Sequence, residues 1–130
     1  MQFNKHDELG NLLEYSRADG PPTSFIWGYD GLYPVAKVEN ISYNDIELRP
    51  EFGQNFSLSG GLSANQEYAL RQMNNAHVTT FKYDKLIGVI EETNPQGKST
   101  LYEYDSVNRL KHIIDQDGNI ISQYQYNYKN

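Results

Sequence analysis

Hydrophobic and polar positions alternate with a period of two in the last third of the chain. Residues 101–104 place Tyr102 and Tyr104 on one face, and residues 123–128 alternate tyrosine with glutamine or asparagine. Residues 78–83 likewise place Phe81 and Tyr83 together. This period is typical of a half-buried β-strand, and β-branched and aromatic residues favour strands. The pattern therefore predicts strands of an antiparallel sheet.

The segments between these strands carry turn residues. Residues 94–97 read Asn-Pro-Gln-Gly, which predicts a type I turn followed by a left-handed glycine. Residues 115–119 read Asp-Gln-Asp-Gly-Asn, and their Asp-Gly pair predicts a tight hairpin. Residues 7–13 repeat the pattern of residues 115–121, so we expect a more diverged hairpin near the N-terminus.

The strands and turns recur at a fixed spacing. Tyr83-Asp84 is followed 21 residues later by Tyr104-Asp105 and 22 residues after that by Tyr126-Asn127. A period near 20 indicates one supersecondary unit copied along the chain. We expect a mainly β fold, in which antiparallel β-hairpin repeats form a curved sheet or partial shell.

The middle of the chain departs from this pattern. Residues 53–61 form a loop rich in small residues, and Ser63 with Gln66 has the form of a capping box that opens a helix. We predict one short helix near residues 63–75, which covers a face or an edge of the sheet. The chain is expected to be a single domain over residues 1–130: diverged hairpins over 1–43, a loop and helix insertion over 44–77, and two repeats over 78–130.

Composition narrows the function classes. The chain has 130 residues, a formal net charge of -6, eleven tyrosines and no cysteine. The negative charge disfavours nucleic acid as a partner, and the missing cysteines exclude disulfides and thiolate metal sites. The first residues contain no apolar run, so we expect no signal peptide within this chain and no membrane insertion.

Candidate catalytic and ligand motifs are incomplete. Gly97-Lys98-Ser99-Thr100 resembles the end of a phosphate loop, but the required upstream glycine is Glu92. The aspartates of residues 115–119 resemble a calcium loop, but its twelfth position is Tyr126 instead of glutamate. The three histidines lack paired ligand spacing. We expect no enzyme activity, no catalytic residue, no cofactor and no metal.

The repeat resembles a known family. Residues 102–110, 115–119 and 124–126 are similar to the YD repeat of Rhs-type proteins: Tyr-Asp, a short gap, Gly-Arg-Leu, a spacer, Gly-Asn, then Tyr-x-Tyr. Residues 1–43, in particular 27–29 and 33–40, resemble the segment before such repeats in Bacteroidetes-type Rhs proteins. Asn108 replaces the usual glycine, and asparagine tolerates a left-handed backbone. The residues that match the repeat signature are Tyr83, Asp84, Gly97, Tyr102, Tyr104, Asp105, Arg109, Gly118, Tyr124 and Tyr126.

The resemblance implies a structural function. In that family, YD repeats either build large β-shells that enclose toxins or form part of bacterial cell-surface proteins. We therefore expect a fragment or short member of the family, a non-catalytic scaffold segment related to polymorphic toxins. Its expected location is extracellular or at the cell surface, and its expected partners are neighbouring repeats, a second copy of itself, a glycan or a toxin payload.

The sequence leaves the role of the repeat tyrosines open, because they form either a thin core or an exposed aromatic row.

The sequence also leaves two alternative functions open. One is a carbohydrate-binding surface module that uses exposed aromatic residues. Its candidate contacts with a glycan or a partner are three aromatic residues in a less regular segment, Trp27, Tyr29 and Tyr33. The other alternative is a small acidic immunity-type partner of a basic toxin.

Overall fold

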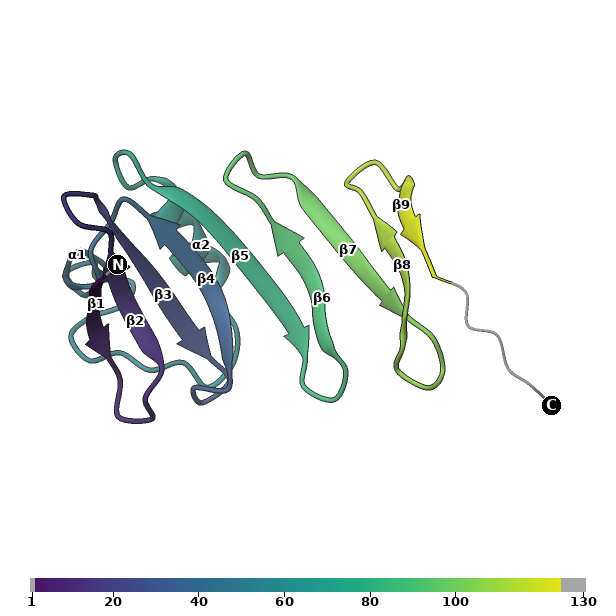
Figure 1. Ribbon diagram of the computed structural model, residues 1–130, viewed down its shortest axis with the longest axis horizontal. Coiled ribbons are helices and arrows are strands. Elements are labelled where there is room, and N and C mark those ends of the chain that lie inside the picture. Colours follow the sequence, from purple (N-terminus) through teal and green to yellow (C-terminus); the bar gives the residue numbers. More distant parts are fainter. Residues whose placement is uncertain (1, 125–130) are drawn as a thin grey trace. The chain divides into compact units, whose positions relative to one another are not determined.

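The computed structural model describes residues 2–124, with side chains from residue 4 onward, and contains nine strands and two helices in that range (Figure 1). Their bounds are β1 (Gln2–His6), β2 (Leu12–Ser16), β3 (Pro22–Gly28), β4 (Tyr33–Glu39), α1 (Tyr43–Glu47), α2 (Ala64–Arg71), β5 (His77–Asp84), β6 (Gly88–Thr93), β7 (Ser99–Tyr104), β8 (Leu110–Ile114) and β9 (Ile120–Gln123).

The strands follow the same order in the sheet as in the chain, from β1 to β9. The pairs with a described register are antiparallel, and all of these except β4–β5 are joined by short turns. The expectation of a mainly β fold built from antiparallel hairpins is therefore confirmed.

The chain divides into two compact units, with the boundary inside β5 between Thr80 and Phe81. This boundary lies close to residue 78, where the sequence places the start of the two YD repeats. The single domain expected over residues 1–130 stays a prediction, because the division concerns contacts within the chain and not independent folding.

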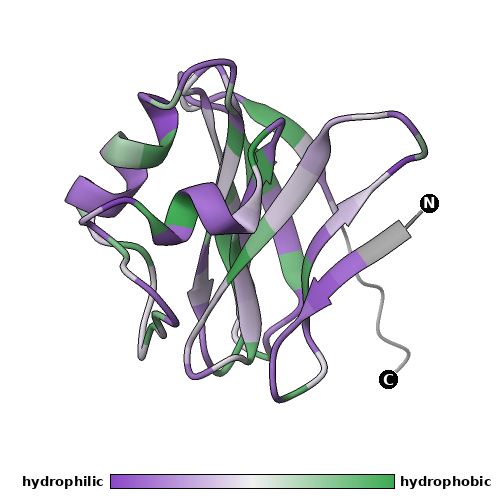
Figure 2. Ribbon diagram, turned by 90° about the vertical axis from the view of Figure 1, so that its left-hand side faces the viewer, coloured by the Kyte–Doolittle hydropathy of each residue, from purple (hydrophilic) through white to green (hydrophobic). Residues whose placement is uncertain are grey.

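The first unit contains the buried core. The inward face of β3 presents Ser24, Ile26 and Gly28, which lie beside buried residues of the neighbouring strand β4 such as Val35. Both helices lie on one side of the strands (Figure 2) and contribute the completely buried Ile46 and Leu70. The helices thus supply the second layer that a half-apolar sheet needs.

Helix α2 begins at the predicted capping box. The Ser63 hydroxyl accepts from the Gln66 N–H at 3.1 Å, and the Gln66 side chain accepts from the Ser63 N–H at 3.0 Å. The predicted helix is confirmed, although it ends at Arg71, before residue 75. Arg71 donates to the carbonyl of Val78 at 3.0 Å, which fixes α2 to β5. The helix therefore covers the sheet, as expected.

Helix α1 was absent from the sequence prediction, which expected a single helix. It is one turn long, and the Ser42 hydroxyl caps it by accepting from the Asp45 N–H at 3.1 Å. The signal was present, because Ser42 and Asp45 have the spacing of a cap before the apolar Ile46. Five residues are too few for helical periodicity to appear.

The second unit has strands and turns only. No residue within 81–124 is buried, and the apolar residues Leu101, Ile120 and Ile121 are exposed. Tyr83, Tyr102 and Tyr104 are half-buried, and Tyr124 is exposed. The described tyrosines therefore form neither a closed core nor a bare aromatic row, and Tyr126 lies outside the described residues.

One turn geometry recurs at four places. An aspartate or asparagine opens each turn, and its Oδ1 accepts from the N–H groups two and four residues later at 2.8–3.0 Å. The fourth residue has a positive φ between 64° and 89°. The opening and fourth residues are Asp7 and Gly10, Asn94 and Gly97, Asp105 and Asn108, and Asp115 and Gly118.

These turns confirm three predictions. Gly97 and Gly118 adopt the left-handed backbone expected of them, and Asn108 adopts it at 64° in place of glycine. The turn at Asp7 confirms the diverged hairpin near the N-terminus. The turn after Asp84 differs, because its positive φ falls one residue later, at Gly88.

Candidate functional site

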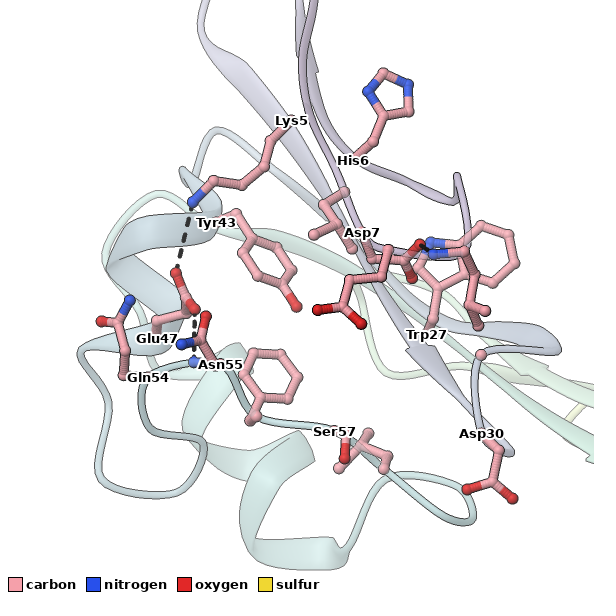
Figure 3. A pocket seen from close by; sticks show the side chains of 16 residues that line it. Lys5, His6, Asp7, Trp27, Asp30, Tyr43, Glu47, Gln54, Asn55 and Ser57 are labelled. Atoms are coloured by element: carbon pink, nitrogen blue, oxygen red, sulfur yellow. Dashed lines mark hydrogen bonds and ion pairs between the residues drawn. The ribbon is translucent and has the colours of Figure 1, made fainter.

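A cleft of about 730 Å³ opens in the first unit (Figure 3). Six segments of the chain form it: β1 with the turn that follows, the start of β2, the end of β3, the turn between β3 and β4, helix α1, and the loop over residues 54–58. The side chains that give it its chemical character are Lys5, His6, Asp7, Glu8, Trp27, Asp30, Tyr43, Glu47 and Phe56.

A buried carboxylate lies on the α1 side of the cleft. The side chain of Glu47 is only 4% exposed, and its Oε1 lies 3.6 Å from the Lys5 Nζ. Its Oε2 accepts from the Asn55 N–H at 2.8 Å. Because a buried carboxylate needs such partners to remain charged, Lys5 and the Asn55 backbone together hold Glu47 in place.

Aromatic rings form much of the cleft wall. The rings of Tyr43 and Phe56 stack with centroids 5.5 Å apart, and Phe52 packs against Phe56 at 4.8 Å. The indole of Trp27 donates to the Leu12 carbonyl at 2.9 Å, which fixes the orientation of the ring. The register with β4 shifts between Ile26 and Trp27, because Val35 is an extra residue on β4 at this point.

The cleft carries negative charge. Asp7, Glu8, Asp30 and Glu47 line it, against the single ammonium of Lys5. Burial raises the pKa of Tyr43 well above its ordinary value, and the charges of Glu47 and Asp7 raise it further. The Lys5 Nζ lies 5.5 Å from the centroid of the Tyr43 ring, within reach of a cation–π interaction. The arrangement thus holds a cation between a carboxylate and an aromatic face.

The three aromatic residues proposed from the sequence do not share one site. Trp27 lines the cleft, whereas Tyr29 and Tyr33 are not among its lining residues. The latter two pack edge-to-face with ring centroids 5.8 Å apart, and the Tyr29 N–H donates to the Gly60 carbonyl at 3.1 Å. A role of the three residues in contacting a glycan or a partner stays a prediction.

The described signature residues of the repeats make structural contacts. The Tyr102 hydroxyl donates to Glu92 at 2.9 Å, and the Tyr104 hydroxyl donates to the Val89 carbonyl at 2.5 Å. The Arg109 N–H groups donate to Asp105, and the bond from the backbone N–H contributes most to a lowered pKa of that carboxyl. Arg109 therefore closes its turn instead of projecting toward a ligand.

Sequence reasoning proposed only Trp27 among the cleft residues, and the residues that it missed include Lys5, Tyr43, Glu47 and Phe56. None of them belongs to a spaced motif, and Lys5 and Glu47 are 42 positions apart.

Two other kinds of feature, a metal site and a membrane-spanning helix, are absent from residues 2–124. No group of three or more histidine and carboxylate side chains in this range could hold a metal ion. No helix in the same range has the length and apolar character needed to span a membrane.

Comparison with known proteins identifies the repeat. Residues 88–120, about a quarter of the chain, match the family model described as RHS Repeat. The match runs from the start of β6 to the start of β9 and includes the turns at Asn94, Asp105 and Asp115. A search of curated proteins found no significant match. Residues 88–120 of the chain thus form an RHS repeat.

Proposed function

We propose that the chain is a non-catalytic scaffold segment of an Rhs/YD-repeat shell or cell-surface protein. The observation that carries this proposal is the open construction of residues 81–124. Consecutive hairpins there leave both faces partly accessible, and no described residue in that range is buried. Repeat units of this kind bury a continuous surface only against neighbouring units.

The edge of the sheet supports contact with further strands. Strand β9 is the last strand in the described part of the chain, and its Ile120 and Ile121 side chains are 54% and 58% exposed. An edge strand presents unpaired N–H and C=O groups that another strand can pair with. We propose neighbouring repeats or a second copy of the chain as partners, and a bacterial extracellular or surface location, which RHS repeats generally have. Residues 27–40 support the Bacteroidetes-type assignment.

Light scattering after size-exclusion chromatography tests this proposal across a tenfold range of concentration. We expect a mass that rises with concentration from the 15.0 kDa of one chain. Because the Tyr124 N–H donates to the Lys111 carbonyl on β8, the Gln123 N–H on the same strand points outward. Gln123→Pro removes that outward donor, so it should reduce association, whereas Gln123→Ala should not. A wild-type chain that stays monomeric throughout would contradict the proposal.

A carbohydrate-binding module is the second candidate, and one observation favours it. Trp27 lines an open cleft, and flat aromatic rings are common platforms for sugar rings. Titration with a panel of neutral glycans, followed by the emission of the single tryptophan, tests this candidate. Wild-type emission that is unchanged across the panel rules it out.

A further inference from the structure

We propose that the cleft of the first unit binds a basic segment of a partner protein and receives an arginine or lysine side chain beside Glu47. This inference concerns the first unit and does not depend on the scaffold role of the repeats. It stands on three features of the cleft: its volume, its charge and the way it holds Lys5.

The contacts of Lys5 show which chemistry the cleft accommodates. The Lys5 ammonium lies 3.6 Å from the Glu47 carboxylate and 5.5 Å from the centroid of the Tyr43 ring. Carboxylate and aromatic face are the two groups that recognise an alkylammonium or guanidinium ion in proteins. The chain's own lysine therefore occupies part of a cation site.

The cleft has room and charge left for a second cation. Its volume of about 730 Å³ is that of a site for a small molecule or several side chains. The carboxylates of Asp7, Glu8 and Asp30 line it in addition to Glu47, so its charge stays negative after Lys5 is counted. Glu8 and Asp30 are exposed, which places them where an entering side chain meets them first.

Charge complementarity selects a basic peptide over a neutral sugar. A sugar would use the aromatic wall but would leave the excess carboxylate charge unbalanced. An arginine can pair with a carboxylate through two N–H groups and stack its plane on an aromatic ring. Both partners are present in this cleft.

The position of Trp27 supplies the assay. Trp27 lines the cleft and is the only tryptophan in the chain, so its emission reports occupancy of the site directly. The full chain is titrated with the blocked tripeptide Gly-Arg-Gly, and the same peptide with citrulline in place of arginine is the neutral control. We expect a saturable change in the Trp27 emission with the arginine peptide only, and we expect this peptide to bind more weakly as the ionic strength rises.

Two pairs of variants locate the effect. Asp30 has a positive φ of 58°, which asparagine tolerates, so Asp30→Asn removes a cleft charge without straining the backbone. It should weaken binding about two- to fivefold, whereas Glu39→Gln, the same change in charge outside the cleft, should leave binding unchanged. Lys5→Met should strengthen binding because it removes the internal competitor, and Lys37→Met is its control outside the cleft.

The sign of the Lys5 effect separates the proposal from general attraction between opposite charges. Equal responses to Lys5→Met and Lys37→Met would overturn it, as would equal binding of the citrulline peptide. Emission that responds to neutral glycans but not to the arginine peptide would assign the cleft to sugars instead. If Lys5→Met fails to fold, the comparison of Asp30→Asn with Glu39→Gln still decides, since neither change removes the contacts that Lys5 and the Asn55 N–H make with Glu47.

Discussion

The hydroxyl of Tyr102 on β7 donates a hydrogen bond of 2.9 Å to the carboxylate of Glu92 on the neighbouring β6. The bond joins two strands of the matched repeat on a face where neither side chain is completely buried. It shows how a sheet without a closed core orders its aromatic side chains: the ring covers the strand while the hydroxyl finds a charged acceptor.

This pair predicts that Tyr102 loses its phenol proton at a higher pH than an ordinary tyrosine. Burial, the hydrogen bond to Glu92 and the Glu92 charge raise the pKa of Tyr102 to about 12. Glu92→Gln removes the charge and should move the pKa back toward 10, with a remainder due to burial. Titration of ¹³C-labelled tyrosine by NMR measures this, and Tyr102→Phe assigns the signal. Glu91→Gln is the control, because Glu91 pairs with Lys82 instead; an equal effect of both variants would contradict the assignment.

The same shift sets the direction of the pH dependence. Below about pH 10 the phenol is neutral in the folded and unfolded chain, so its contribution to stability is complete. Between pH 10 and about 12 the unfolded chain loses this proton while the folded chain keeps it, and stability falls as pH rises. Urea denaturation at pH 9 and pH 11 should show a smaller loss for Tyr102→Phe than for wild type.

The turn at Asp105 predicts a position that tolerates glycine but not a β-branched residue. Asn108 is exposed and has a φ of 64°. Asn108→Val should destabilise the chain by about 1–2 kcal/mol, the cost of a left-handed backbone for an ordinary residue. Asn108→Gly should be nearly neutral. Urea denaturation of the two variants checks the difference, and equal midpoints would show that the left-handed backbone is not required.

Gly28 predicts a steric requirement in the first unit. A Cβ at this position would collide with the carbonyl oxygen of Gly60 and lie 2.8 Å from Val35 Cγ1. Gly28→Ala should cost about 1–3 kcal/mol, as is typical of overpacking, and should lower the Tm. Gly60→Ala is the matched control, since a Cβ there meets no heavy atom within 4 Å. A Tm for Gly28→Ala equal to that of the control would show that the loop yields freely.

The capping box of α2 predicts a loss of stability smaller than that expected for Gly28→Ala. Ser63→Ala removes the acceptor for the Gln66 N–H and should cost about 1 kcal/mol. Ser63→Asp keeps an acceptor at the same position and should retain most of the stability. Thermal unfolding followed by circular dichroism compares the two variants. If both lose the same amount, the side-chain bond is not what stabilises the start of the helix.

Features set by a few consecutive residues were predictable from the sequence. The turns at Asn94 and Asp115 depend on five residues each, and the start of α2 depends on Ser63 and Gln66. In each case the side chain that defines the structure bonds to backbone two to four positions away. Local chemistry of this kind is legible without knowledge of the fold.

The cleft was not predictable for the opposite reason. Lys5 and Glu47 meet only because β1 and α1 are brought together by the strands between them. Trp27 was singled out as an aromatic in an irregular segment, yet nothing in the sequence separates it from Tyr29, which packs elsewhere. The half-burial of Tyr102 and Tyr104 was also hidden, because alternation identifies a face but not what covers it.

The order of the strands has a consequence for how the chain folds. Between β5 and β9 each strand pairs with the next one along the chain across a short turn, so these contacts form at low contact order. The pairing of β4 with β5 is different, because Glu39 meets His77 only after the segment that contains both helices has been closed into a loop. Loop closure of this length costs entropy before any contact repays it. We therefore expect the hairpins after β5 to form early, and we expect the docking of β5 onto β4 to limit the folding rate of the first unit.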